Sequence, residues 1–200
     1  MKITSWYIRL FFCLIPLLSF TENEERKSTG SKTAYRELPS IFIMDKGAKP
    51  VQSLYSFFYK YNLEADSAFL INLIRTYIKE AELEGINYEV AFCQMCLETG
   101  FLRFSGSVSR FQNNFCGLGA VNAATAGDWF NSVEEGVRAH IQHLKAYASV
   151  EPVKTELVDK RFHKVRRGLA FTIFDLAGRW AMDPHYGSKI SYLLKRLYEE

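Results

Sequence analysis

The stretch YEVAFCQMCLETGFLRFSG, residues 88–106, decides the fold of this chain. Its apolar residues form a helical run, and Glu98 stands near the end of that run, just before a turn that contains glycine and several aromatic residues. Contact with Phe101, Leu102 and Phe104 would remove water from this carboxyl, and desolvation raises the pKa of an acid. The sequence therefore predicts a carboxyl that keeps its proton near neutral pH, which is the state that a general acid needs.

Apolar residues recur at helical spacing on both sides of this run. Asn87 precedes the central helix as an N-cap, and Gly85 ends the helix before it. Within the central helix, the spacing places Glu98 on the same stripe as Gln94, at the rim of the buried face. Gln94 is expected either to orient Glu98 or to be an ordinary, partly exposed helix residue. The expected helices span residues 53–61, 67–84, 88–99, 132–148, 173–182 and 186–198, and no strand longer than a few residues is expected.

The composition indicates one globular domain with a weak net charge. The 200 residues include 48% hydrophobic and 15% aromatic side chains, which is enough to bury a core. Setting aside the first twenty residues, which hold Lys2 and Arg9, leaves 23 basic against 22 acidic side chains. Because this field is weak, we expect no nucleic-acid partner.

The N-terminal segment is typical of an export signal. Residues 1–20 begin with two basic side chains and continue into an apolar run that is too short to be read first as a membrane span. The expected cleavage position holds a bulky residue, so an uncleaved membrane anchor is the alternative. Residues 21–40 are charged and rich in serine and threonine, as in a flexible tether, and residues 41–200 are expected to form the catalytic domain. We expect an exported protein of the periplasm or cell envelope.

The cysteines give no reason to expect a metal or a cofactor. Cys93 and Cys96 form a C-x-x-C pattern, but it lies inside a predicted helix and does not open one, so a redox-active pair is not favoured. Zinc would need two more ligands, and only His140 and His143 have suitable spacing. Buried thiols that pack as small apolar groups are the better interpretation.

Residues 103–131 have no helical period and are rich in glycine and asparagine. Asn113 and Asn114 supply amides next to aromatic side chains such as Trp129. Amides and flat apolar faces suit a groove that binds sugars, because hydroxyl groups need hydrogen bonds and pyranose C–H faces need stacking. A loop that satisfies its own backbone is an equally good interpretation of this pattern.

Four segments resemble motifs of the bacterial glucosaminidase domains, glycoside hydrolase family 73, which includes autolysins and the flagellar peptidoglycan hydrolase. The segment QMCLETG, residues 94–100, is similar to the A-Q-x-x-L-E-[ST]-G motif that carries the family's catalytic acid. NNFCGLGA, residues 113–120, resembles an N-N-x-x-G-[IL] turn, and FNSVEEGVRAHIQHL, residues 130–144, resembles an S-x-E-E helix. RWAMDPHYGSKI, residues 179–190, is similar to Y-A-T-D-P-x-Y-A-x-K-I.

This resemblance implies a mainly α, lysozyme-like helical domain in which an extended loop or a small β-lobe forms one wall of a groove. It implies a monomeric enzyme that cleaves the β-1,4 bond between N-acetylglucosamine and N-acetylmuramic acid in the peptidoglycan glycan strand, with Glu98 as general acid. The residues expected to bind substrate are Gln94, Phe104, Asn113, Asn114, Trp180 and Tyr186. Trp180 replaces the tyrosine that is usual in the family, which keeps an aromatic face and loses a hydroxyl.

The second catalytic group stays open. The S-x-E-E resemblance favours Glu135. However, Ser132 and Glu135 also form a capping box, in which the side chain of Glu135 ordinarily accepts from the backbone N–H of Ser132. Asp128 is another acid to consider. In a third route, the N-acetyl group of the substrate acts as the nucleophile and no second carboxylate is needed.

Two other functions remain compatible with the sequence. A lytic transglycosylase also relies on one glutamate in a lysozyme-like fold, but it releases an anhydro sugar. A catalytically silent glycan-binding or envelope scaffold domain would keep the groove without the reaction, since a fold and a motif do not prove activity.

Overall fold

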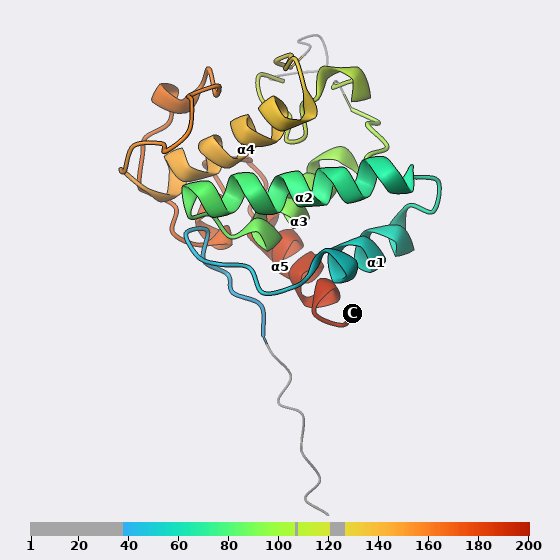
Figure 1. Cartoon of the computed structure of the whole chain (residues 1–200). Coiled ribbons are helices and arrows are strands. Elements are labelled where there is room, and N and C mark those ends of the chain that lie inside the picture. The colour runs from blue at the N-terminus through green and yellow to red at the C-terminus, as the bar shows by residue number, and fades with distance from the viewer. Residues whose placement is uncertain (1–37, 107, 121–126) are drawn as a thin grey trace, which may run out of the picture. The chain divides into compact units, whose positions relative to one another are not determined.

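Five α-helices form the framework of this computed structural model, which describes residues 38–106, 108–120 and 127–200 (Figure 1). They are α1 (Val51–Tyr61), α2 (Ser67–Glu84), α3 (Tyr88–Thr99), α4 (Val133–Ala148) and α5 (Tyr186–Leu197), with short 3-10 helices η1 (Arg110–Gln112), η2 (Phe162–Lys164) and η3 (Ile173–Leu176). The prediction of a mainly helical domain is confirmed. The expected export segment, and the expected tether up to residue 37, lie outside the described residues. Within the described ranges, no helix has the length and apolar character needed to span a membrane.

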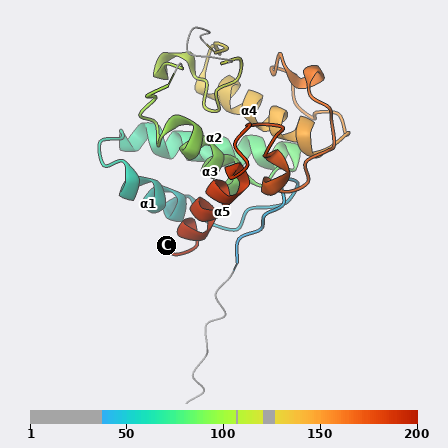
Figure 2. The same ribbon diagram turned by 180° about the vertical axis from the view of Figure 1, so that it is seen from behind.

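Helix α3 lies among the other helices and is buried on almost all sides. It packs against α2, α4 and α5 (Figure 1 and Figure 2), and ten of its twelve residues are buried. Asn87 begins the helix, because its side-chain oxygen accepts hydrogen bonds from the N–H groups of Glu89 and Val90. Gly100 ends it in a left-handed conformation with a φ of 58°, which glycine adopts without a steric penalty. The acid Glu98 therefore comes at the exposed end of a rigid, buried element.

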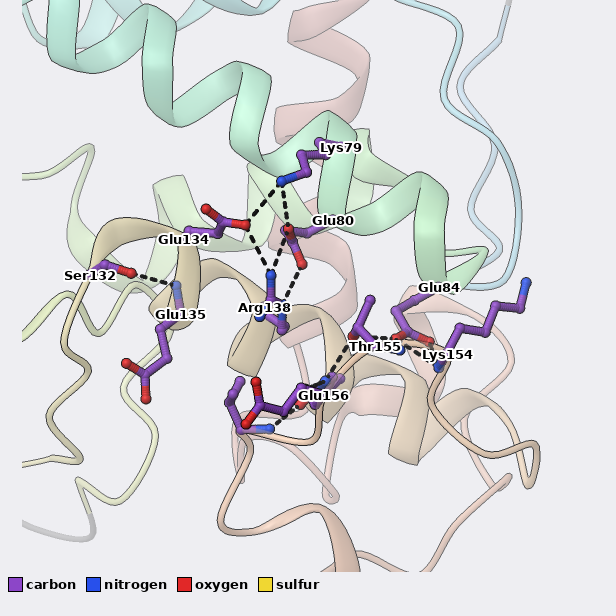
Figure 3. A network of polar contacts seen from close by, with 12 residues as sticks. Lys79, Glu80, Glu84, Ser132, Glu134, Glu135, Arg138, Lys154, Thr155 and Glu156 are labelled. Atoms are coloured by element: carbon purple, nitrogen blue, oxygen red, sulfur yellow. Dashed lines mark hydrogen bonds and ion pairs between the residues drawn. The ribbon is translucent and has the colours of Figure 1, made fainter.

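Two buried carboxylates fix helix α4 against helix α2 (Figure 3). Glu80 and Glu84 lie one turn apart on α2, and both are almost completely shielded from solvent. Nε of Arg138 donates to Glu80 at 2.8 Å, and Nζ of Lys145 lies 2.8 Å from Glu84. Glu84 also accepts hydrogen bonds from the N–H and the hydroxyl of Thr155, in the connector after α4. These contacts set the position of α4 along α2.

The prediction of a helix over residues 173–182 is wrong. The short helix η3 ends at Leu176, and the chain then turns through Gly178, whose φ of 73° is left-handed. The N–H of Gly178 donates to the carbonyl of Ala181 at 2.7 Å, which closes a short loop around Trp180. Apolar spacing predicted a continuous helix here because it does not show which glycine will take a positive φ.

Loops form the other wall of the groove. The resemblance allowed an extended loop or a small β-lobe, and the described residues contain isolated bridges but no strand. Asn114 organises this loop: its Nδ2 donates to the carbonyls of Leu118 and Asp128 at 2.8 and 3.0 Å. Its Oδ1 accepts from the N–H of Leu118 at 3.0 Å. This loop is therefore held together by hydrogen bonds between one side chain and the backbone, and not by hydrogen bonds between strands.

The turn that follows α3 has an unusual backbone. Phe101 and Leu102 have φ values of 57° and 62°, directly after the left-handed Gly100. Such a conformation costs roughly 1 kcal/mol or more for a residue with a side chain, so the surroundings must hold it in place. The ring of Phe101 stacks on Tyr61 with 4.3 Å between centroids, and its carbonyl accepts from Nδ2 of Asn62 at 2.8 Å. The turn is therefore fixed against the end of α1.

Candidate active site

A pocket of about 310 Å³ opens at the C-terminal end of α3. Glu98 lines it, together with three residues that were expected to contact substrate: Phe104, Asn114 and Trp180. The rest of the lining comes from Thr99, Gly106, Val108, Cys116, Gly117, Ala120 and Ala181. The pocket lies between the helical core and the loops that follow α3, which is the place expected for a groove.

The carboxyl of Glu98 is open to this pocket and is bound on its other side. Nε1–H of Trp180 donates to Oε1 at 3.1 Å, and the hydroxyl of Tyr186 donates to the same oxygen. Burial raises the pKa of Glu98, and these two hydrogen bonds lower it by less, so the pKa stays above its ordinary value. The pKa of Glu98 is raised, as predicted. The cause differs in part, because Phe101, one of the three residues expected to shield Glu98 from water, packs on Tyr61.

The two oxygens of Glu98 are not equivalent. The indole N–H of Trp180 can only donate. The hydroxyl of Tyr186 accepts a hydrogen bond from Nε2 of Gln94 at 2.8 Å, so its own hydrogen goes to Oε1 of Glu98. Since Oε1 accepts two hydrogen bonds, an acidic proton on Glu98 belongs on Oε2.

A chain of buried hydrogen bonds continues from Tyr186 into the core. Oε1 of Gln94 lies 3.0 Å from Nε2 of His140, and Nδ1 of His140 lies 2.9 Å from the hydroxyl of Tyr77. Burial, with a smaller contribution from a neighbouring histidine, lowers the pKa of His140 to about 3, so the ring is neutral and carries one N–H. An amide oxygen only accepts, so that N–H is on Nε2 and Tyr77 donates to Nδ1. Each hydrogen bond of this chain, which we call the relay, points toward Glu98.

Trp180 is held by aromatic rings on the side away from the pocket. The centroids of His140, His143 and Tyr147 lie 5.7, 5.1 and 5.7 Å from that of its indole. The sequence suggested that replacing the family's tyrosine with Trp180 removes a hydroxyl from the groove. The structure shows that the indole N–H supplies a hydrogen bond to the acid from this position.

The three amides that were expected to bind sugar are engaged within the protein. Gln94 is fully buried and contacts Tyr186, which fits the orienting role and not the exposed one. Asn113 is not among the residues that line the pocket, because its φ of 50° directs Nδ2 to the carbonyl of Phe130 at 3.0 Å. Asn114 lines the pocket, but bonds within its own loop occupy both of its amide hydrogens. The self-satisfied loop is the better description of Asn113 and Asn114.

Glu135 is bound by the residue before its own helix. Its carboxylate accepts from the backbone N–H and from Nδ2 of Asn131, each at 2.8 Å, and not from the N–H of Ser132 as expected. The hydroxyl of Ser132 accepts from the N–H of Glu135 at 3.1 Å, so the helix start itself is as predicted. The side chain of Glu135 points away from the ion pairs between α2 and α4 (Figure 3).

Asp128 lies 3.1 Å from Nε of Arg161, at the edge of the loop wall. Neither this acid nor Glu135 is among the residues that line the pocket. Glu98 is thus the only acid that the described ranges contribute to the lining, and the sequence VNAATA of residues 121–126 contains no acid.

Comparison with known proteins agrees with this site. The sequence model of the glucosaminidase family, described as mannosyl-glycoprotein endo-beta-N-acetylglucosaminidase, matches residues 74–199. This chain belongs to the glucosaminidase family. An uncharacterized protein of Borreliella burgdorferi is 44% identical to this glucosaminidase over 158 residues, which cover 79% of the chain and 78% of that relative. No solved structure gives a significant match. The glucosaminidase is a glycoside hydrolase of the peptidoglycan type, and its substrate is a glycan.

Sequence reasoning missed the inner half of the relay. His140 was considered only as a zinc ligand, and Tyr77 was not considered as part of a site. Both lie on apolar helical faces, where a polar side chain needs a buried partner. That requirement was the available signal, but Tyr77 binds His140 and His140 binds Gln94, each on a different helix, and spacing within one helix does not show such pairs.

Proposed function

We propose that this glucosaminidase is an exported enzyme that hydrolyses the β-1,4 bond between N-acetylglucosamine and N-acetylmuramic acid in peptidoglycan, with Glu98 as general acid. The environment of Glu98 carries the proposal: a carboxyl with a raised pKa opens into a pocket, and two donors occupy one of its oxygens. The apolar segment at residues 10–20 supports export, because peptidoglycan lies outside the cytoplasmic membrane.

In this mechanism, the proton on Oε2 of Glu98 moves to the bridging oxygen as the bond from that oxygen to C1 of N-acetylglucosamine breaks. Loss of the proton leaves a carboxylate on Glu98. The donors from Trp180 and Tyr186 then stabilise the new charge on Oε1. Gln94 and His140 hold the hydroxyl of Tyr186 in the donating orientation.

For the second catalytic group, we propose the N-acetyl group of the substrate. It attacks C1 as the leaving oxygen departs and forms a cyclic oxazolinium ion, which water then opens while returning a proton to Glu98. The support is that Glu98 is the single acid in the described lining of the pocket. This route retains the anomeric configuration, so NMR of the first-formed product tests it, and an inverted product would exclude it.

The function is tested by digestion of purified peptidoglycan with the whole chain and with its Glu98→Gln variant. The amide cannot donate the missing proton, so we expect a rate lower by roughly 10²–10⁴-fold. Mass spectrometry of the fragments identifies the bond that was cut. Reducing N-acetylglucosamine ends are expected, whereas anhydro-muramyl ends would show a lytic transglycosylase.

A matched Glu135→Gln variant separates the two glutamates. Since the carboxylate of Glu135 binds Asn131 and does not line the pocket, we expect cleavage to persist in this variant. Binding of peptidoglycan without cleavage by any of the three proteins would overturn the proposed reaction in favour of a scaffold role.

A further inference from the structure

A second cavity, of about 650 Å³, is lined by basic residues. Arg161, Lys164, Arg166 and Arg179 line this basic pocket, and none of its lining residues is an acid. Concave surfaces that carry charge of one sign concentrate the field and attract ions of the opposite sign. The sequence alone suggested a solvated basic face here, but a hollow of this size can hold a ligand.

The basic pocket lies close to the pocket that Glu98 lines, which we call the acid pocket, in the region of Trp180. Trp180 and Ala181 line the acid pocket, and the two residues before them, Gly178 and Arg179, line the basic pocket. His143 also lines the basic pocket, and its ring centroid lies 5.1 Å from that of Trp180. Residues 178–181 and the contact between His143 and Trp180 therefore connect the walls of the two pockets.

Of the four cations of the basic pocket, Arg161 and Arg179 have side-chain hydrogen bonds to other described residues, and Lys164 and Arg166 do not. Arg161 pairs with Asp128 at 3.1 Å. Lys164 and Arg166 have exposed side chains, and no ion pair joins either of them to another described residue. Their charges are therefore available to a ligand.

We propose that the basic pocket binds carboxylates of the peptide stem that the leaving sugar carries. The inference rests on the proposed function. In peptidoglycan, the stem is linked through a lactyl group to O3 of N-acetylmuramic acid, next to the O4 that Glu98 protonates, and stems carry free carboxylates. Arginine and lysine bind carboxylates through charge-assisted hydrogen bonds. The stem of the sugar in the acid pocket thus meets the available charges of Lys164 and Arg166.

The test compares two substrates and two variants of the whole chain. The substrates are intact peptidoglycan and the same glycan strands after an amidase has removed their stems. The test variant is Lys164→Gln with Arg166→Gln, and the matched control is Lys154→Gln with Lys195→Gln, two exposed lysines outside both pockets. We expect the test variant to lose about tenfold in kcat/KM on intact peptidoglycan, since two partly exposed contacts are removed.

The same variant should cleave stem-free strands at the wild-type rate, and the control should match the wild type on both substrates. Equal rates for the test variant and the wild type on intact peptidoglycan would overturn the role of the basic pocket and leave the proposed reaction standing. An equal loss on both substrates would also overturn it, because the stem would then not be the group recognised.

A binding measurement decides the question even if no cleavage is found. Soluble stem peptide is titrated into the ¹⁵N-labelled chain, and inorganic phosphate is titrated separately. We expect the peptide to shift the amide signals of residues 161–166 in the wild type and not in the test variant. Absence of these shifts, or an equal response to phosphate, would contradict a site for stem carboxylates. Failure of the wild type to cleave either substrate would instead contradict the proposed function.

Discussion

At the scale of single residues, the unequal oxygens of Glu98 are the main feature of the site. Oε1 is bound by Trp180 and Tyr186, and Oε2 is left for the transferable proton. The two donors act on both states of the acid. They keep the pKa lower than burial alone would make it, and they stabilise the carboxylate that forms when the proton leaves.

We expect Tyr186→Phe to move the high-pH limit of activity to higher pH. The hydroxyl of Tyr186 favours the charged form of Glu98, so its removal raises the pKa of Glu98 further, and the acid stays protonated to higher pH. The maximal rate should fall about 10-fold to 100-fold, because the new carboxylate loses a charge-assisted hydrogen bond. A pH–rate profile measures both effects. Tyr192→Phe, on the exposed face of α5, is the matched control, and a limit that moves to lower pH would contradict the assignment.

The stability of Glu98→Gln relative to the wild type is expected to increase with pH. The folded-state pKa of Glu98 is raised by burial, so its contribution to stability is present below the unfolded pKa and is lost as pH rises through the folded pKa. The amide has no charge to bury and still accepts from Trp180 and Tyr186 through its oxygen. Urea unfolding at pH 4 and pH 7 tests this, and a constant difference between the two proteins would show that Glu98 is not desolvated.

At the scale of the elements, α2 and α4 are joined through polar groups in their common interface. Hydrogen bonds from Lys145, Thr155 and the N–H of Lys154 outweigh the effect of burial on Glu84 and lower its pKa. The same carboxylate thus fixes α4 and the connector after it (Figure 3). This arrangement defines where α4 places His140 beside Gln94.

Lys145→Met is expected to lower the free energy of unfolding by about 3 kcal/mol, because it leaves the buried Glu84 carboxylate without its cation. The double variant Glu84→Gln with Lys145→Met should recover part of this loss, since no buried charge remains. Lys79→Met, in the exposed pair with Glu134 on the same interface, is the matched control and should cost much less, because solvent screens this pair. Equal losses from the buried and exposed lysines, measured by urea unfolding, would contradict the role of burial.

At the scale of the whole molecule, the relay makes stability depend on pH. His140 is neutral in the folded state because burial lowers its pKa to about 3, whereas an unfolded histidine titrates near its ordinary value of about 6.5. Its contribution is therefore present above the unfolded pKa and is lost as pH falls toward the folded pKa. This dependence has the opposite sign to that of Glu98.

His140→Gln should make the pH dependence of stability shallower. Between about pH 6 and pH 4 the unfolded wild type binds one more proton at this position than the folded protein, which corresponds to a slope of about 1.4 kcal/mol per pH unit. The variant lacks this slope even if it is less stable at every pH. Unfolding free energies measured by urea at half-unit steps of pH test the prediction, and parallel curves for the two proteins would contradict it.

Three residues that the sequence singled out, Glu98, Trp180 and Tyr186, lie in contact in the structure, whereas the inner part of the relay was not predicted. Glu98 follows from local pattern, and Trp180 and Tyr186 follow from the resemblance over residues 179–190. Gln94 was identified, but its partners were not, because a hydrogen bond between α3 and α4 depends on how the helices pack. The sequence left open whether the amides of Asn113 and Asn114 bind sugar or the backbone of their own loop, because the hydrogen bonds that a loop needs depend on its turns.

The relay takes one residue from each of four helices: Tyr77 from α2, His140 from α4, Gln94 from α3 and Tyr186 from α5. Because its hydrogen bonds all point the same way, their dipoles add, and neighbouring bonds polarise one another. The positive end of this aligned row faces the carboxyl of Glu98, much as a helix N-terminus faces an anion. A shift of any one helix would break the alignment, so the electrostatic potential at the acid depends on the packing of the whole helical core.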